Sequence, residues 1–521
     1  MSGDTLKILF AMIGYMLVVI GIGLYFAKRA QANSENYFLG GRSLGPWVAA
    51  MSAEASDMSG WLLMGLPGVA YWCGLADAAW TAVGLALGTY VNWLIVAKRL
   101  RRYSAVSGDA ITVPDFLSNR FHEDRKIILA ISAIFILIFF TVYAASCFVT
   151  CGKLFSTLFG LSYHSMMIAG AVFVVVYTFI GGFLAESASD FMQAVVMVIA
   201  LLTILILGTS AAGGLDAVIA NAKEIPGYFS MTSIATPETD AAGVQNVVGG
   251  IPQFGGAGSY GLLTIISTLS WGLGYFGVPQ VLLRFMAIRK EEELKKSRRI
   301  ATVWCFISLS AAVMIGLIGR ALFPAETSLL TAGGAENVFV VLSQALLPAV
   351  MAGVIMAGIL AATISSSDSY LLIAASAFAK NIYEGIMKKN QVDDKVVMKV
   401  SRIVLLLIAL IGIVIAWDEN SVIFSIVSFA WAGFGATFGP VMLFSLFWKR
   451  INRAGAIAGM LSGGIMVFVW NRFLSPLGGV FAIYELFPAF VISCIVIVIV
   501  SLCTKEPSEQ IIKEFEQAAG K

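Results

Sequence analysis

Apolar runs of about twenty residues alternate with short polar segments along almost the whole chain. A helix of that length crosses the hydrocarbon core of a bilayer, and lipid allows only helices or closed barrels to span it. The pattern therefore predicts an all-α, polytopic membrane protein with about 13 transmembrane helices. The predicted spans are Leu6–Phe26, Gly45–Trp72, Leu75–Val96, Ile127–Cys151, Ser165–Phe183, Phe191–Thr209, Gly261–Ile288, Thr302–Leu322, Leu346–Phe378, Ile403–Trp417, Val422–Trp448, Ala454–Phe473 and Leu486–Cys503.

The basic residues support this count and give it an orientation. If the amino terminus is outside, all but five of the 34 Lys and Arg residues fall in or toward the inside loops. An even number of spans, or the opposite start, would remove this asymmetry, so the positive-inside rule predicts a cytoplasmic carboxyl terminus. The five residues left outside are Lys7, Lys153, Lys223, Arg320 and Arg472.

The segments between the spans carry little further structure in this prediction. The outside loop from Ser210 to Tyr260 is rich in glycine and is expected to hold short helices. Ala335 to Gln344 reads as a short surface helix, and the tail Thr504–Lys521 as a brief charged helix. One membrane domain fills the chain, without a sensor or kinase domain.

Composition agrees with a membrane protein and excludes other classes. Hydrophobic residues make up 59% of the 521 residues and charged residues only 12%, against roughly a quarter in soluble proteins. The net charge of +3 indicates no nucleic-acid partner, and no obligate protein partner is evident. The six cysteines lie in or beside apolar runs and are expected to be free thiols. Cys147 and Cys151, four apart on a predicted helix, could clamp a soft metal, but packing is favoured because neither histidine lies on that segment.

Two spans have interiors that interrupt a helix. The second contains SAEASDMSGWLLMGLPG, with Glu54 and Asp57, and the seventh contains STLSWGLGYFGVP. These spans are five apart, and a five-span unit followed by its copy lies in the membrane upside down. Interrupted spans at equivalent places of two inverted halves indicate a transporter site. Close helix packing also uses small residues, but it does not explain Asp57.

The ninth span supplies complementary chemistry. LAATISSSDSY places five serine and threonine hydroxyls and the carboxylate of Asp368 in the middle of a bilayer-length helix. A single serine can return its hydroxyl to its own backbone, but together these groups offer the hard oxygen ligands that an alkali cation needs. An unwound second span would add freed carbonyls. The second and ninth spans together therefore predict a Na⁺ site.

Six strings, in this order, resemble the sodium:solute symporter family and most closely its proline-transporting branch. They are YFLGGRSLG, SDMSGWLLMGLPG, FTVYAAS, TFIGGFLAESASDFMQ, SWGLGYFGVPQ and SFAWAGFGATFGP, from Tyr37 to about residue 440. The resemblance implies sodium-coupled uptake of L-proline across the plasma membrane, which is the inner membrane in a bacterium, with Na⁺ as coupling ion and no organic cofactor. It also implies a LeuT-like five-plus-five inverted repeat.

The resemblance divides the chain into four parts. Residues 1–44 would be the first span and an inside loop, and residues 45–448 the transport core. Within the core, repeat one would cover about 45–210 and repeat two about 261–448. Two additional spans would follow in 449–503, with the cytoplasmic tail in 504–521.

The family's sites carry over to particular residues. Sodium would be held by carbonyls of Ala55, Met58 and Ala362 and by hydroxyls of Ser365 and Ser366, where Ser366 replaces a threonine of other proline symporters. The resemblance assigns coupling and gating to Asp57, Asp190 and Arg42, although Asp190 as an interfacial charge and Arg42 as an orientation signal remain alternatives. Implied substrate contacts are Ser59, Gly60, Trp61, Tyr143, Trp271, Tyr275 and Pro279.

Three questions stay open at the level of sequence. The same fold could carry another amino acid, a carboxylate or a sugar, although Trp271 and Tyr275 argue for proline. A receptor or a channel is a further alternative, but no signalling domain, charged ring or repeated pore loop is visible. Glu54 departs from the glycine that proline symporters carry there, and facing Asp57 it would leave proton involvement open.

Overall fold

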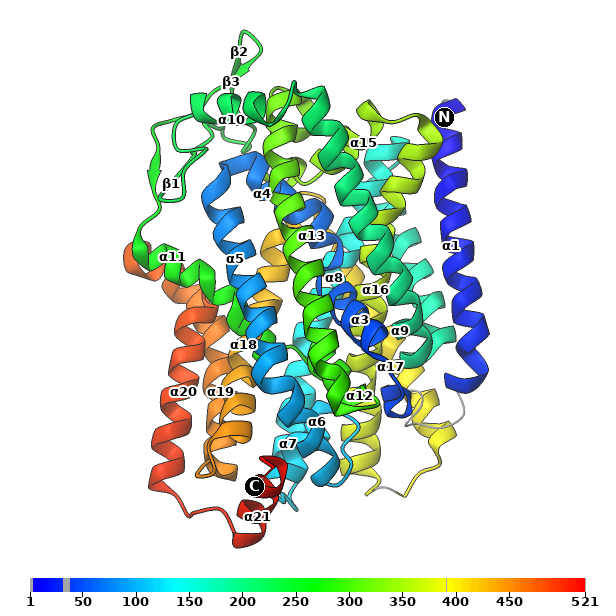
Figure 1. Cartoon of the computed structure of the whole chain (residues 1–521), viewed down its shortest axis with the longest axis vertical. Helices are drawn as coiled ribbons and strands as arrows, with labels where there is room; N and C mark the ends of the chain where they lie inside the picture. The colour runs from blue at the N-terminus through cyan, green and yellow to red at the C-terminus, as the bar shows by residue number, and fades with distance from the viewer. Residues whose placement is uncertain (1–2, 31–37, 390, 521) are drawn as a thin grey trace.

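The computed structural model describes residues 3–30, 38–389 and 391–520 and shows a bundle of long helices running roughly along one direction (Figure 1). Tyr37, the first residue of the matching strings, lies outside the described residues. The helices are α1 (Gly3–Ala30), α3 (Pro46–Asp57), α4 (Leu66–Cys73), α5 (Leu75–Val91), α6 (Ala97–Val106), α7 (Val113–Arg120), α8 (Ile127–Phe159), α9 (Tyr163–Ala211), α10 (Leu215–Glu224), α11 (Leu262–Leu269), α12 (Pro279–Ala287), α13 (Leu294–Leu322), α14 (Ala332–Ala335), α15 (Val338–Leu346), α16 (Ala349–Ser376), α17 (Asp394–Ile415), α18 (Ile423–Phe447), α19 (Arg453–Val469), α20 (Leu486–Cys503) and α21 (Glu509–Ala518).

Shorter elements join or extend these helices. The π-helical turns are η2 (Trp61–Gly65), η3 (Asn92–Val96), η7 (Ala377–Met387) and η8 (Trp470–Leu474). The 3₁₀ segments are η1 (Gly40–Arg42), η4 (Ser270–Phe276), η5 (Glu291–Glu293), η6 (Thr327–Leu329), η9 (Ser475–Leu477) and η10 (Gly479–Phe481). The strands are β1 (Ser233–Ile234), β2 (Val247–Val248), β3 (Ile251–Pro252) and β4 (Gly258–Ser259).

The described residues contain ten helices long and apolar enough to cross a membrane, and an eleventh if the pair α11–η4 and α12, bent by 42°, is one span. Two shorter apolar helices, Trp61–Cys73 and Tyr163–Phe179, complete this set. The chain is therefore a multi-pass helical membrane protein, as predicted. The count of 13 stays a prediction.

Helix α9 folds back on itself although it is helical from Tyr163 to Ala211. The hydroxyls of Tyr177 and Ser189 lie 2.7 Å apart, across twelve positions. In a straight α-helix these two residues would be about 18 Å apart along the axis, which is beyond the reach of their side chains. The chain therefore bends sharply between them, in the region where the sequence predicts the fifth span to end and the sixth to begin.

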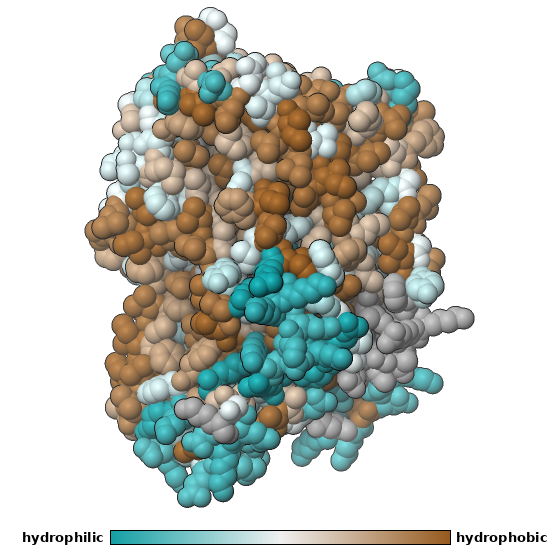
Figure 2. Space-filling model, in the orientation of Figure 1, coloured by the Kyte–Doolittle hydropathy of each residue, from teal (hydrophilic) through white to brown (hydrophobic). Residues whose placement is uncertain are grey.

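The two ends of the bundle differ in character. Figure 1 shows the start of α1, α10 and the strands at one end, which we call the loop end, and α21 at the other, the tail end. Figure 2 shows hydrophilic residues gathered toward the tail end and a hydrophobic band above them. The loop after α9 holds the expected helix α10, together with two small antiparallel pairs, β1 with β4 and β2 with β3.

The prediction of a surface helix from Ala335 to Gln344 is wrong. Helix α15 covers most of this segment, and Val338, Phe339 and Leu342 are completely buried. It packs against α9, α13 and α16. The segment was misread because a short apolar helix at the edge of a membrane core resembles an interfacial one.

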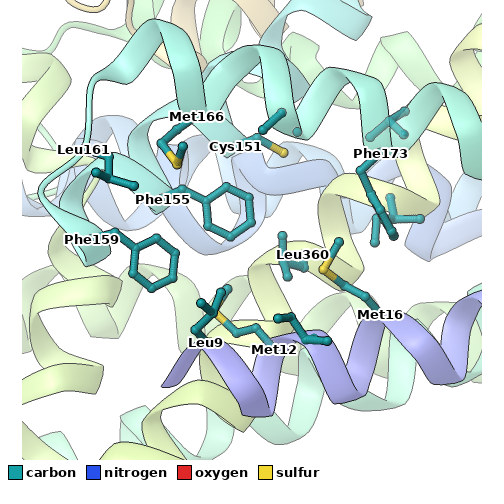
Figure 3. A pocket seen from close by; sticks show the side chains of 15 residues that line it. Leu9, Met12, Met16, Cys151, Phe155, Phe159, Leu161, Met166, Phe173 and Leu360 are labelled. Carbon is teal, nitrogen blue, oxygen red and sulfur yellow. The ribbon is translucent and has the colours of Figure 1, made fainter. Parts of the chain in front are cut away.

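An apolar pocket of about 330 Å³ separates part of α1 from the rest of the bundle. Figure 3 shows Met12 and Met16 of α1 on one side, Phe155 and Phe173 on the other, and Leu360 of α16 between them. Leu360 lies two residues before Ala362. The pocket therefore touches the back of the helix that carries the predicted sodium ligands.

Glycines let α5 and η4 cross at backbone contact. A Cβ added to Gly88 would lie 2.4 Å from the carbonyl oxygen of Gly272, and one added to Gly272 would lie 2.2 Å from that of Gly84. Gly84 and Gly88 are four residues apart, the small-residue spacing that brings membrane helices together. This crossing positions the aromatic residues of η4.

We expect Gly88→Ala to destabilise the protein by about 1–3 kcal/mol, because the clash is with backbone atoms that have no rotamer to change. Thermal unfolding of purified protein in detergent, followed by size exclusion, measures the effect. Gly14→Ala is the matched control, since an added Cβ there meets nothing within 4 Å. Equal midpoints for both variants would contradict the close crossing.

Candidate functional site

The second predicted span is broken where its polar residues indicate. Helix α3 ends at Asp57, the helix is interrupted at Met58, and the chain continues through η2 into α4. Ser59 has φ +20°, a conformation that L-residues rarely adopt. A Cβ on Gly60 would lie only 2.5 Å from a side-chain carbon of Thr150, so this position requires glycine. The backbone conformation of Ser59 and the close packing of Gly60 therefore both belong to the break in this helix.

Hydroxyls of α16 reach the end of α3. Ser365 Oγ donates to the carbonyl of Ala55 at 2.8 Å, and Ser366 Oγ donates to the same carbonyl at 3.2 Å. The carbonyl of Ala362 lies 3.1 Å from Ser365 Oγ. Four of the five predicted sodium ligands are therefore brought together, and hydroxyl and carbonyl oxygens are a donor set that suits an alkali cation.

Asp57 links this oxygen cluster to η4. The hydroxyl of Tyr275 donates to Asp57 Oδ2 at 2.6 Å, and that of Tyr143 donates to the Asp57 carbonyl at 3.4 Å. Asp57 Oδ1 has no hydrogen-bond partner among the described residues. The carbonyl of Met58, the fifth predicted ligand, instead accepts the Leu62 amide at 3.1 Å.

Predicted substrate residues form a tight aromatic cluster. The rings of Trp61 and Trp271 are 5.5 Å apart, and Phe424 lies 5.8 Å and 5.3 Å from them. Trp431 Nε1 donates to the carbonyl of Trp271 at 2.8 Å, and its ring meets Tyr275 edge-on at 5.0 Å. All these rings are nearly buried apart from Phe424.

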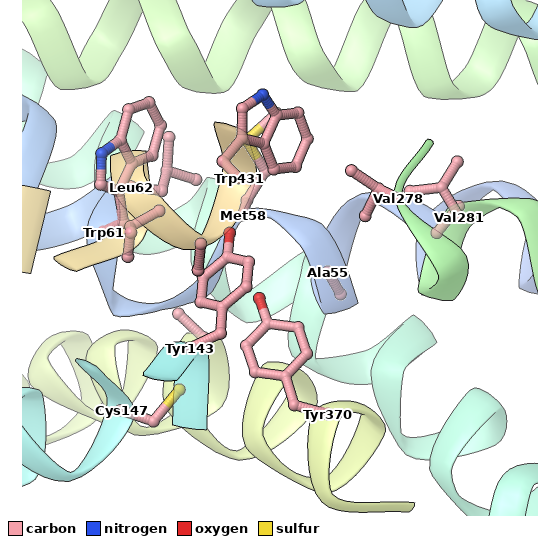
Figure 4. Packing of buried hydrophobic residues seen from close by; sticks show 14 of the residues in the cluster. Ala55, Met58, Trp61, Leu62, Tyr143, Cys147, Val278, Val281, Tyr370 and Trp431 are labelled. Carbon is pink, nitrogen blue, oxygen red and sulfur yellow. The ribbon is translucent and has the colours of Figure 1, made fainter. Parts of the chain in front are cut away.

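Tyr143 extends the cluster toward α16. Its ring stacks on Tyr370 with centroids 4.2 Å apart. Figure 4 shows Trp61, Trp431 and Tyr143 around Met58, at the interruption of α3. The Ser59 hydroxyl, close by in sequence, accepts the amide of Trp61 at 3.2 Å. Aromatic faces and the broken helix therefore meet at one place.

The seventh predicted span is also broken. After η4 the chain turns at Gly277 and restarts as α12 at Pro279, which is buried and occupies the first turn, where proline suits a helix. A Cβ on Gly277 would lie 2.4 Å from the Phe434 carbonyl oxygen and 2.6 Å from the Gly439 nitrogen.

Arg42 binds the tail end of α12. Its guanidinium donates to the Met286 carbonyl at 2.7 Å, the Ala110 carbonyl at 2.8 Å and the Ser104 hydroxyl at 3.2 Å. It also forms an ion pair with Asp109 at 2.9 Å. The residue therefore joins its own segment to the end of α6 and to the end of α12, which are far apart in the sequence.

Asp190 lies in a fully buried charge cluster around Arg284. Arg284 Nη2 donates to Glu186 Oε1, to Asp190 Oδ2 at 3.2 Å and to Ser369 Oγ at 2.9 Å. Ser52 Oγ donates to Asp190 Oδ2 at 2.7 Å and accepts Arg284 Nε at 3.0 Å. The Asp190 side chain has no exposed surface, so its charge is compensated by Arg284 and Ser52 inside the protein.

A second buried ion pair lies toward the loop end. Lys153 Nζ is 2.7 Å from Glu336 Oε2, and both side chains are almost completely buried. The same carboxylate accepts the backbone amides of Ile423 and Phe424 at 2.9 Å each. Glu336 therefore fixes the first turn of α18, and with it the Phe424 ring against Trp61.

Sequence reasoning missed several of these residues. Arg284 lies inside the predicted seventh span, where an ionisable residue is by itself a signal of function. Glu186 and Asp368 stand in strings that were recognised, but no partner was assigned to them. Phe424 had no such signal. Glu54 is 1% exposed, and its Oε2 has no hydrogen-bond partner among the described residues.

A helical membrane bundle with two interrupted helices meeting at buried oxygens and aromatic rings defines a secondary transporter. A model of the sodium:solute symporter family matches residues 37–463, and the chain belongs to that family. It is therefore a sodium-coupled symporter and not an enzyme. Na⁺ is its coupling ion.

Known relatives and structures agree with this membership. The chain is 41% identical over 498 residues to the sodium/proline symporter of Staphylococcus aureus (strain USA300), covering 95% of this chain and 92% of that protein. A substrate-bound, outward-open Na⁺-coupled sialic acid symporter has a TM-score of 0.76 at 19% identity, over 96% of this chain and 99% of that one. MhsT in complex with L-phenylalanine has a TM-score of 0.53 at 13% identity, over 87% and 97%. The fold is LeuT-like.

We expect Arg284→Met to destabilise the fold by about 3–5 kcal/mol, because it leaves buried carboxylates without their cation. Arg289→Met is the control: Arg289 pairs with Glu293 on the surface, so its loss changes stability by about 0.5 kcal/mol or less. Thermal unfolding in detergent measures both. A midpoint for Arg284→Met equal to that of the control would contradict the cluster's structural role.

Proposed function

We propose that this chain takes up L-proline together with Na⁺ by alternating access. The observation that carries the proposal is the meeting of the Ala55 carbonyl and the Ser365 and Ser366 hydroxyls beside the Trp61–Trp271 pair. The relatives named as sodium/proline symporters supply the solute. A pyrrolidine ring with a cationic nitrogen suits a cluster of aromatic faces.

Sodium binds, in this proposal, to oxygens of Ala55, Met58, Ala362, Ser365 and Ser366. In the structure the two hydroxyls donate to the Ala55 carbonyl. When the ion enters, these hydroxyls turn their lone pairs toward it and the carbonyl is freed to coordinate. The Met58 carbonyl joins once the turn that ties it to Leu62 loosens.

Proline binds next to the break of α3. Backbone N–H groups around Ser59 and Gly60, at the start of a new half-helix, receive the carboxylate. The rings of Trp61, Trp271, Tyr143 and Tyr275 receive the pyrrolidine and its ammonium, with Pro279 at the far edge. Because Trp61 and Trp271 are in contact, they must separate before the solute enters.

Asp57, Asp190 and Arg42 couple these sites to the gates. Asp57 follows a sodium ligand by two residues and accepts the Tyr275 hydroxyl, so the ion and the aromatic cluster act on the same turn. Asp190 lies on the sodium exit route through the Arg284 cluster. Arg42 closes the tail end of α12 and releases it when the site opens inward.

The proposed architecture has 13 spans, counting the ten long helices, the bent pair and the two shorter apolar helices. Repeat one covers about 45–210 and repeat two about 261–448, preceded by residues 1–44 and followed by 449–503 and 504–521. The loop end faces outward and the tail end the cytoplasm, so the amino terminus is outside and the carboxyl terminus cytoplasmic. The chain lies in the plasma membrane and works without an obligate protein partner.

The membrane potential drives the cycle in this scheme. Moving one positive charge inward is favoured by about 2.3 kcal/mol per 100 mV. Proline at neutral pH carries no net charge, so the charge moved is that of sodium. Accumulation therefore depends on both the sodium gradient and the voltage.

In proteoliposomes, an inward sodium gradient is expected to drive accumulation of labelled proline above equilibrium. Lithium, potassium and different pH values are compared at equal ionic strength. Asp57→Cys is expected to abolish or greatly weaken this uptake, since it removes the acceptor of the Tyr275 hydroxyl beside the ion. If labelled proline only equilibrates across the membrane and does not accumulate, the proposal is wrong and the protein is a facilitator or channel.

Ser366→Ala is expected to raise the sodium concentration for half-maximal uptake about tenfold, with a smaller change in the proline concentration required. It removes a hydroxyl that reaches across to α3, and a charge-linked oxygen contact contributes about 1.4 kcal/mol or more. Ser367→Ala is the matched control, because Ser367 Oγ donates to the Thr363 carbonyl of its own helix at 2.6 Å. If Ser367→Ala raised the sodium concentration for half-maximal uptake more than Ser366→Ala does, the proposed sodium ligands would be wrong.

A second candidate is the same sodium coupling with another small solute, such as a different amino acid or a carboxylate. Competition of labelled proline uptake by a panel of unlabelled solutes separates the two. Strong competition by proline and its ring analogues alone supports the proposal. A better competitor without the ring would replace proline as the solute.

A further inference from the structure

The carboxyl-terminal helix α21 is docked on the tail end of the bundle. Ser508 caps its start, and Ile511, Phe515 and Ala518 point into the protein and are buried. Glu516 and Gln517 on the other side are exposed. A helix with one buried apolar stripe and one charged face is held by a specific partner surface.

Phe515 is the centre of this contact. Its ring lies 4.7 Å from the guanidinium carbon of Arg99 and 5.6 Å from that of Arg120. It also meets Tyr103 edge-on at 6.4 Å. Arg99 and Tyr103 belong to α6 and Arg120 to α7. A single aromatic ring therefore contacts two separate helices at the tail end.

Arg120 needs such a partner because it is fully buried and forms no ion pair among the described residues. Its guanidinium lies 5.1 Å from Tyr103 and 5.1 Å from Phe121, with Phe515 as the third ring. Arg120 Nε donates to the Ser445 carbonyl, near the end of α18, at 3.2 Å. The negative faces of aromatic rings can compensate a desolvated guanidinium.

The ring contacts lead from α21 to both halves of the core. Arg99 also lies 5.1 Å from the ring of Phe447, the last residue of α18. The docking surface thus contains α6 and α7 from the first half and the end of α18 from the second. A side chain placed across these elements resists their separation.

Helix α6, which contacts the Phe515 ring, also binds the end of α12. Arg101 Nε donates to the Ile288 carbonyl at 2.8 Å, and Arg102 pairs with Glu291. Ser104, one turn further, accepts Arg42, which also holds the Met286 carbonyl. The tail end of α12 is therefore attached to α6, the same helix that contacts the Phe515 ring through Arg99 and Tyr103.

Polar contacts also hold α21 and the segment before it. His122, in the turn between α7 and α8, lies 2.8 Å from Glu514. Arg450 donates to the Thr504 carbonyl at 2.9 Å and pairs with Glu506 at 3.4 Å. The tail is thus anchored before α21 begins as well as along it.

We propose that α21 is a latch on the tail-end gate and that Phe515 is its positioning residue. Docked, the ring holds Arg99, Arg120 and the end of α18 together, and α6 keeps the end of α12 closed. Undocked, these elements separate more readily and the site opens toward the tail end more often. The proposal rests on the alternating-access part of the proposed function, and not on the identity of the solute.

The test measures opening directly in the full-length protein. In a background with the native cysteines replaced, Met286→Cys reports on the tail end of α12, where this side chain is fully buried. The probe is a membrane-impermeant maleimide applied from the tail end, with no solute present. Phe515→Ala is expected to increase the labelling rate about fivefold or more, which is the scale of coupling between linked sites.

Three further variants separate positioning from folding. Glu516→Ala, on the exposed face of α21, is expected to label as slowly as the parent. Phe515→Tyr keeps an aromatic face and is expected to restore slow labelling, whereas Phe515→Leu keeps the apolar volume but not the face and is expected to label fast. Each variant is first shown to be monodisperse in detergent.

Unchanged labelling of Phe515→Ala in folded protein would overturn the latch. Slow labelling of Phe515→Leu would overturn the role of the aromatic face. Labelling needs no transported solute, so the labelling rates still test the latch if the protein does not take up proline. Conversely, normal proline accumulation with unchanged labelling in Phe515→Ala would reject the latch while keeping the proposed function.

Discussion

The buried guanidinium of Arg284 is the contact on which the geometry of the site depends. It stands on α12 and meets Ser52 of α3, Glu186 and Asp190 of α9 and Ser369 of α16. Both broken spans and α16, the helix with the proposed sodium ligands, thus share one cation. Interrupted helices give up part of their own hydrogen bonding, and in lipid each loose group is costly. The cluster holds the half-helices of α3 and α12 in place beside their breaks.

The break in α3 then joins two chemistries within three residues. Ala55 receives the α16 hydroxyls, and Asp57 receives the Tyr275 hydroxyl of η4. An ion that reorients the hydroxyls would change their hydrogen bonds to the Ala55 carbonyl. The same turn of the chain continues directly to Trp61. In the proposed mechanism, coupling between sodium and solute therefore needs no long pathway, because the two proposed sites are adjacent on one segment.

Sequence alone predicted the parts of the site that break local rules. Serine, aspartate, glycine and proline inside an apolar run are conspicuous, so the interruptions near Met58 and Gly277 and the hydroxyls of α16 were found. Arg284 was missed because it lies four residues before the predicted end of its span, where arginine usually marks the interface. Phe424 was missed because an aromatic residue in an apolar chain carries no signal until its distant neighbours are known. The docking of α21 was missed for the same reason, since one phenylalanine in a charged tail looks like chance.

In the proposed alternating-access cycle, contacts at both ends of the bundle have to open, and the contacts at the two ends differ in burial. Toward the loop end, the nearly buried pair of Lys153 and Glu336 also holds the first turn of α18 and sets Phe424 against Trp61. Breaking a buried ion pair exposes two charges that must be solvated, so this end opens only when water or ligand reaches them. Toward the tail end, Arg42 pairs with an exposed aspartate and binds backbone carbonyls, Arg101 binds the end of α12, and the Phe515 ring lies against Arg99. A half-exposed ion pair costs less free energy to break than a buried one. The proposed contact of α21 raises the free energy of opening at the tail end toward that at the loop end. Alternation between the two ends requires that these free energies are similar.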